Sequence, residues 1–200
     1  MNEITVTMAI VDFIPVVLFF IAAILLQNDF YNKLSKTKYT LLASGSMMVF
    51  VGGLLKATWK ILYALNICDY PALDFSFFPL SGIGFLLVFL SLTGICSKSF
   101  NNKLLTVVPV FTSNMPFVIL QIIGCAGTQG MLFVKSLQMK KKSAAVMFVV
   151  AFIFMLGMGY LSAKFDDSSS MHWLAQCTNI VSQGAFLAGT WILHKAKLKK

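Results

Sequence analysis

The sequence has few charged residues and contains no arginine. Only 12% of the 200 residues are charged, against about 25% in a typical soluble domain. Hydrophobic residues make up 58% of the chain, and the mean hydropathy is +0.82. A soluble fold of this size could not hide so much apolar surface, because a folded chain still exposes a large fraction of its residues. The composition therefore excludes an ordinary soluble domain and favours a protein embedded in lipid.

The chain also lacks the short motifs of common catalytic and cofactor sites. It has no HExxH, GxSxG, P-loop or dinucleotide-binding fingerprint. Its four cysteines are not spaced as CxxC, so neither a zinc site nor a disulfide framework is predicted. We therefore expect no cofactor and no metal. The N-terminus has no basic segment before its first apolar run, which predicts a retained first helix rather than a cleaved signal peptide.

Apolar runs of about 20 residues, the length of a membrane-crossing helix, recur along the whole chain. Transmembrane β-strands would instead appear as short alternating segments. The sequence thus predicts an all-α, polytopic transmembrane helical bundle that fills residues 1–200 as a single integral membrane domain. The runs cover about 8–27, 39–65, 75–96, 104–135, 144–163 and 171–194.

The run over 104–135 is too long for one crossing. Its interior holds Asn114, which is suited to an N-cap, and Pro116, which is tolerated in the first turn of a helix. The run therefore predicts a short helix near 103–113 and a full helix near 116–137. This division gives seven crossings, which we favour over six. The shorter helix covers only about 17 Å at 1.5 Å per residue, so it is tilted, extended or re-entrant.

Lysines are concentrated in the segments between the apolar runs. Short lysine-rich segments stay in the cytoplasm, and seven crossings with the N-terminus outside place all of them there. This predicts a cell-membrane protein with a cytoplasmic C-terminus. The net charge of +9 is then a topology signal, and no nucleic-acid partner is expected. The lysine-rich segments hold Lys33, Lys36 and Lys38; Lys98 and Lys103; Lys135 and Lys140 to Lys142; and Lys195, Lys197, Lys199 and Lys200.

The last apolar run carries a stripe of polar residues: His172, Gln176, Asn179, Gln183 and Thr190. At 100° per residue, all five lie within an arc of about 60°. An unpaired amide in lipid costs a few kcal/mol, so the stripe has to face other helices or water. It either holds helices together by hydrogen bonds or lines a polar cavity.

A second polar group falls in the half of the membrane nearest the N-terminus. Lys56 and Lys60 are one turn apart on one helix, and Asp12 lies near the start of the first. Charges at such depth usually face the protein interior and pair with one another. We expect Asp12 to pair with Lys56, directly or through water, while Lys60 can reach the headgroups. The proposed topology places Asn114 and His172 at the same level.

These residues leave three functions open. The first is transport or binding of a small polar or anionic solute in an outward-facing cavity lined by Asp12, Lys56, Lys60, Asn114, His172, Gln176, Asn179 and Gln183. The second is a non-catalytic membrane subunit or sensor whose polar stripes only bind helices or a partner subunit. The third is an intramembrane enzyme using Asp12 or His172 as a general acid–base. We favour a protein that is not an enzyme, with the lipid bilayer as its solvent.

Overall fold

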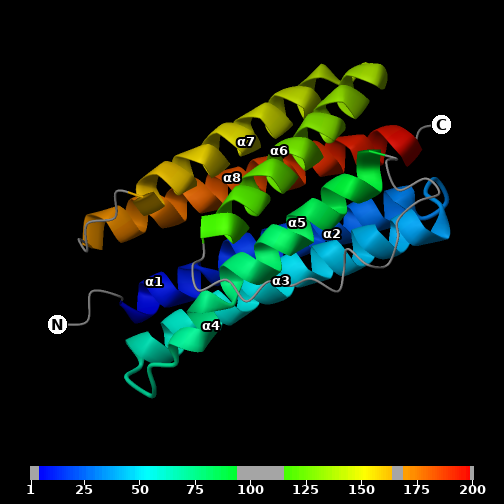
Figure 1. Ribbon diagram of the computed structural model, residues 1–200. Helices are drawn as coiled ribbons and strands as arrows, with labels where there is room; N and C mark the ends of the chain where they lie inside the picture. The colour runs from blue at the N-terminus through cyan, green and yellow to red at the C-terminus, as the bar shows by residue number, and fades with distance from the viewer. Residues whose placement is uncertain (1–4, 94–114, 164–168, 199–200) are drawn as a thin grey trace.

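The chain folds into a bundle of long helices in a computed structural model (Figure 1). The structure describes residues 5–93, 115–163 and 169–198. Within these ranges there are eight helices and no strand, which confirms the predicted all-α class. The helices are α1 (Val6–Val11), α2 (Phe13–Phe30), α3 (Lys36–Ala64), α4 (Pro71–Phe75), α5 (Phe77–Thr93), α6 (Met115–Gln138), α7 (Lys142–Ala163) and α8 (Ser169–Leu198).

Four helical stretches are long and apolar enough to cross a membrane. They follow the apolar runs of the sequence, because backbone groups in lipid have to form their hydrogen bonds within the helix. The full helix predicted near 116–137 is confirmed as α6, whereas the short helix predicted near 103–113 lies outside the described residues. α7 adds a shorter apolar stretch over Lys142–Met158. The four stretches are Val6–Phe30, Lys36–Ala64, Pro71–Thr93 and Met115–Gln138.

The six long helices form a closed ring. α2 packs against both α3 and α8, α3 against α5, α5 against α6, α6 against α7, and α7 against α8. Figure 1 shows the ring from the side, with α7 and α8 on one flank and α2, α3 and α5 on the other. Each helix therefore turns one face toward the axis of the ring and another toward the outside of the bundle.

α5 and α6 run parallel, whereas α3 and α5 run antiparallel. Gly82 of α5 lies against the backbone of Phe117, and Phe85 lies against Gly124, so the residue numbers rise together along the two helices. The end of α5 and the start of α6 consequently lie at opposite ends of the bundle (Figure 1). The connection between them, residues 94–114, lies outside the described residues.

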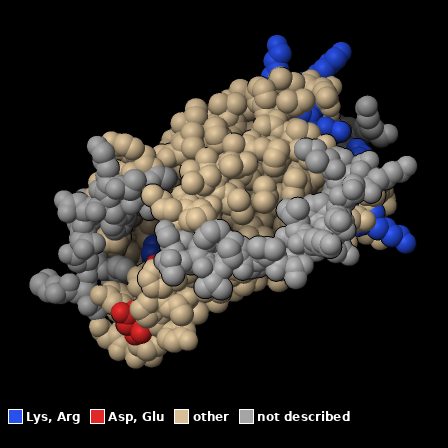
Figure 2. Space-filling model, in the orientation of Figure 1, with Lys and Arg blue, Asp and Glu red and all other residues tan. Residues whose placement is uncertain are grey.

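Charge is segregated along the bundle. The end formed by the α2–α3 and α6–α7 connections and the last turn of α8 carries exposed lysines, and we call it the lysine-rich end (Figures 1 and 2). The opposite end, with α1, α4 and the start of α8, carries Asp12, Asp69 and Asp74, and we call it the acidic end. The described lysines of the connections and the tail thus gather at one end, and Lys56 and Lys60 lie at the acidic end with Asp12, both as the sequence predicts.

Candidate functional site

The first helix is interrupted at Asp12, between α1 and α2. Pro15 explains the break, because its ring lacks an amide hydrogen and crowds the carbonyl of Val11. The carboxylate of Asp12 accepts from the ammonium of Lys60 on α3 at 2.5 Å. Both side chains are mostly buried, with 12% of Asp12 and 15% of Lys60 exposed. The kink in the first helix thus positions a buried counter-ion for Lys60.

Lys56 lies one turn deeper on α3 and pairs with a different carboxylate. Its Nζ is 3.5 Å from Oδ1 of Asp74 on the short helix α4, and each side chain is 30% exposed. The same Nζ lies 4.8 Å and 5.4 Å from the ring centroids of Phe77 and Phe78 at the start of α5. Aromatic faces attract cations at such distances. Lys56 is therefore in contact with a carboxylate and with two aromatic rings.

Asp12 and Lys56 do not form the expected direct ion pair, whereas an interaction between them through water stays a prediction. Asp12 pairs with Lys60, and Lys56 pairs with Asp74. The reason is geometric, because two residues four apart on a helix differ by about 6 Å in height and about 40° in direction. Lys60 is the one that faces the α1–α2 junction. The two lysines are nevertheless neighbours on one face of α3, as the spacing predicts.

Gln176 connects the polar stripe of α8 to the same end of the bundle. It is buried, with 4% exposed, and its Nε2 donates to the backbone carbonyl of Met8 at 2.8 Å. Its Oε1 is buried and has no hydrogen-bond partner within the described part of the chain. Because Met8 belongs to α1, this bond ties α1 to α8, and the Asp12–Lys60 pair ties the α1–α2 junction to α3.

The rest of the predicted stripe is less uniform. Thr190 is buried and Leu174 is 51% exposed, in agreement with a stripe that faces the bundle. His172, Asn179 and Gln183 are only half-buried. The remaining predicted site residue, Asn114, lies outside the described residues. The structure therefore brings Asp12, Lys56, Lys60 and Gln176 to one end of the bundle, with His172 on the first turn of α8.

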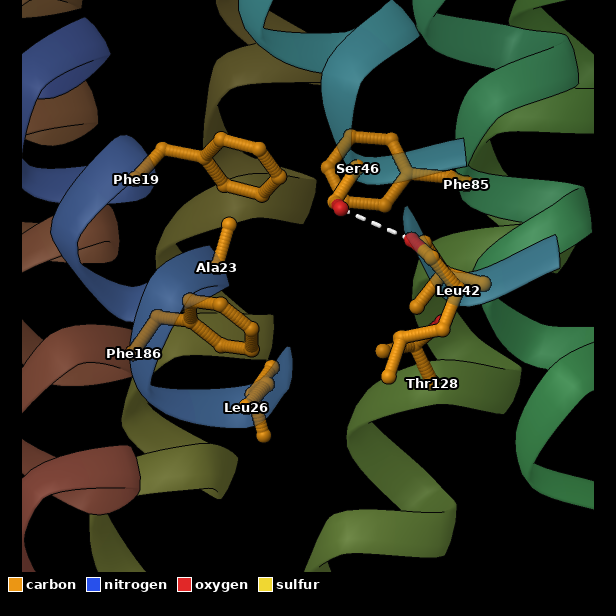
Figure 3. Close-up of a pocket in the computed structure, with 9 residues that line it drawn as sticks. Phe19, Ala23, Leu26, Leu42, Ser46, Phe85, Thr128 and Phe186 are labelled. Carbon is orange, nitrogen blue, oxygen red and sulfur yellow. Dashed lines mark hydrogen bonds between the residues drawn. The ribbon is translucent and has the colours of Figure 1, made fainter. Parts of the chain in front are cut away.

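The axis of the ring holds a small cavity with a mainly apolar lining. Figure 3 shows Phe19, Phe85 and Phe186 around it. The ring of Phe19 stacks on that of Phe186, with 6.1 Å between the ring centroids. It meets the ring of Phe85 edge-on, with 5.7 Å between the centroids. Five helices, α2, α3, α5, α6 and α8, contribute to the lining, which consists of Phe19, Ala23, Leu26, Leu42, Ser46, Phe85, Val88, Thr128 and Phe186. The phenylalanines therefore narrow the axis, and Asn179 and Gln183 do not line this cavity.

Several polar contacts were not predicted. Trp59 donates its indole N–H to Asp69 at 3.0 Å at the acidic end. At the lysine-rich end, Nδ1 of His194 lies 2.9 Å from Oδ1 of Asp29, joining α8 to α2. Asp29 is an acidic residue beside a lysine-rich segment, and this isolated acid could have been singled out in the sequence as a candidate for a polar contact. Its partner lies 165 positions away, and no local spacing could identify it.

Comparison of the chain with protein families, with curated proteins and with solved structures finds no match. The candidate site therefore rests on the residues themselves. Its distinguishing feature is a pair of neighbouring lysines on a membrane helix, each matched by a carboxylate from another element.

Proposed function

We propose that this chain is a membrane protein that binds a small anionic solute at its acidic end and transports it. One observation carries the proposal: Lys56 and Lys60 occupy successive turns of α3, and their counter-ions come from outside α3. A cation within a membrane helix is costly and usually marks a solute or ion site. The ammonium of Lys56 offers a positive charge to a carboxylate, phosphate or sulfate, one turn away from the paired ammonium of Lys60.

The surroundings of the lysines favour anion binding over a purely structural role. Charge–charge attraction strengthens where water is excluded, and only 30% of the Lys56 side chain is exposed. Transport would continue along the ring axis, past the phenylalanines that narrow it in this state.

The binding proposal is tested with purified protein in detergent at constant ionic strength. We expect the sodium salt of at least one small anion, from a panel of mono- and dicarboxylates, phosphate and sulfate, to raise the melting temperature saturably above a matched chloride control. A ligand at 100 times its Kd stabilises by about 2.7 kcal/mol. Lys56→Met should abolish the shift, and Lys141→Met, at the lysine-rich end, should retain it. No shift with any anion, or equal loss in both variants, would contradict the proposal.

Uptake separates transport from binding alone. Proteoliposomes containing the wild-type protein should accumulate the anion that gives the largest thermal shift, and Lys56→Met should reduce the rate at least about tenfold. Protein-free liposomes give the leak rate. Saturable binding without uptake would leave a solute-binding protein and overturn the transport step.

We also propose seven crossings of the cell membrane, with the N-terminus outside and the C-terminus in the cytoplasm. Support comes from the parallel course of α5 and α6, because the connection over 94–114 has to return from one end of the bundle to the other. Its 21 residues are enough to cross a hydrocarbon core of about 30 Å at 1.5 Å per residue. The lysine-rich end would then face the cytoplasm.

Cysteine labelling of intact cells tests this topology. One variant retains only Cys68, which is exposed beside α4 at the acidic end. The other has no native cysteine and carries Lys141→Cys at the lysine-rich end. A membrane-impermeant maleimide should label Cys68 from outside and should reach the Lys141→Cys variant only after permeabilisation. Labelling of that variant in intact cells would contradict the orientation.

A second function, a non-catalytic membrane subunit or sensor, is favoured by one observation. Lys56, Lys60 and Gln176 each already contact a group of the same chain. Interhelical polar contacts of this kind stabilise a bundle by about 0.6–2 kcal/mol each. If they serve only stability, substitutions should lower the melting temperature and no anion should restore it.

A further inference from the structure

We infer that Asp74 occupies the position of the solute's anionic group in the free protein, and that an incoming anion displaces it together with α4. This inference rests on the proposed function. It assigns different roles to the two ion pairs of the site: Asp12–Lys60 is a permanent pair, and Asp74–Lys56 is an exchangeable one. The ligand class it names is a small molecule bearing a carboxylate or phosphate.

The two pairs differ in length and in burial. Asp12 and Lys60 are 2.5 Å apart and mostly buried. Asp74 and Lys56 are 3.5 Å apart, with 30% of each side chain exposed. Charge-assisted N–H···O bonds are usually 2.7–2.9 Å long, so the second pair is a long contact. Partly exposed ion pairs contribute little to stability. An external anion therefore displaces the carboxylate paired with Lys56 at a lower free-energy cost than the carboxylate paired with Lys60.

The element that carries Asp74 is weakly packed. α4 has only five residues, Pro71–Phe75, and none of them is buried. Phe75 at its end is 59% exposed, and Tyr70 before it is 58% exposed. Segments with few buried contacts open at low free-energy cost. Movement of α4 away from Lys56 would therefore break few buried contacts, and it requires a hinge at Ser76, which joins α4 to α5.

Lys56 itself would stay in place when Asp74 leaves. Its ammonium also lies over Phe77 and Phe78, which belong to the first turn of α5. α5 is fixed on α3 by close backbone contact, in which Gly52 lies against the carbonyl of Phe77. The rings thus keep the ammonium oriented, and the site is formed before the anion arrives. A preformed site gives up less free energy on binding than one that has to be assembled.

Asp74→Asn is the deciding variant, and Asp69→Asn is its control. Asp69 carries the same charge at the same end of the bundle and bonds Trp59 instead of a lysine. Titration calorimetry with the anion that gives the largest thermal shift should show a Kd about tenfold lower in Asp74→Asn than in wild type, because the competing carboxylate is gone. Asp69→Asn should change the Kd by less than about threefold. An unchanged or higher Kd in Asp74→Asn, or equal gains in both variants, would overturn the inference.

The fluorescence of Trp59 provides an independent measure of the displacement of α4. Its indole N–H donates to Asp69, which lies in the connection leading to α4. With Trp173→Phe and Trp191→Phe removing the other two tryptophans, the anion should change Trp59 fluorescence with the same midpoint as the calorimetric titration. Binding without a fluorescence change would mean that α4 stays in place, which overturns the displacement. Absence of binding in both wild type and Asp74→Asn would instead reject the proposed function itself.

Discussion

Lys60→Met is expected to lower the stability of the detergent-solubilised protein more than Lys56→Met does. Removing one partner of a buried ion pair costs about 3–5 kcal/mol, because the other charge is left without compensation. The stranded group would be Asp12, of which only 12% is exposed. Lys56→Met should cost less, since 30% of the side chain of its partner Asp74 is exposed, against 12% for Asp12.

A double-mutant cycle identifies the pair as the cause. Asp12→Asn combined with Lys60→Met should recover part of the melting temperature lost in Lys60→Met, because no charge then remains unpaired. Lys141→Met, at the exposed lysine-rich end, controls for the loss of one lysine and should leave the melting temperature nearly unchanged. Strictly additive effects of the Asp12 and Lys60 substitutions would show that the two side chains do not stabilise each other.

The lengths of the helices were predictable because each is encoded locally. The run near 39–65 became α3, Lys36–Ala64, and the helix expected near 116–137 became α6, Met115–Gln138. Lipid leaves an apolar run of this length little alternative to a helix, since every backbone group has to be satisfied within the segment. The break at Asp12 is also local, because it follows from the position of Pro15.

The neighbours of each helix were not predictable in the same way. Core-facing and lipid-facing positions are both apolar, so a helix such as α7 shows almost no preferred face in its sequence. The parallel course of α5 and α6 depends on close contacts such as Gly82 with Phe117 and Phe85 with Gly124. The glycines are visible in the sequence and indicate close packing, but the local sequence does not identify which helix packs against them.

The candidate site shows both what the sequence could predict and what it could not. The depth of a residue along a helix can be counted from its number, and this count correctly placed Asp12, Lys56 and Lys60 at one end of the bundle. Direction around each helix axis depends on tertiary packing, and this is why the partners of the lysines were misassigned. Asp74 was not among the predicted site residues, because its role arises from the packing of α4 against α3.

Gly84→Ala is the second substitution with a large expected effect. A Cβ at Gly84 would lie 2.7 Å from the carbonyl oxygen of Gly45 and 2.7 Å from a methyl of Val49. A Cβ at Gly45 would in turn lie 2.6 Å from the carbonyl oxygen of Gly84. The backbones of α3 and α5 therefore touch, and neither can yield locally. Overpacking of this kind costs about 1–3 kcal/mol, and α3 and α5 have to separate.

Gly130→Ala is the matched control, because a Cβ at Gly130 meets nothing within 4 Å. Alanine favours a helix by up to about 1 kcal/mol over glycine. The two identical substitutions should thus shift the melting temperature in opposite directions, down for Gly84→Ala and unchanged or up for Gly130→Ala. Equal shifts would contradict the close contact of α3 and α5. Because α3 carries Lys56 and α5 carries Phe77, Gly84→Ala should also weaken anion binding, whereas Gly130→Ala should leave it intact.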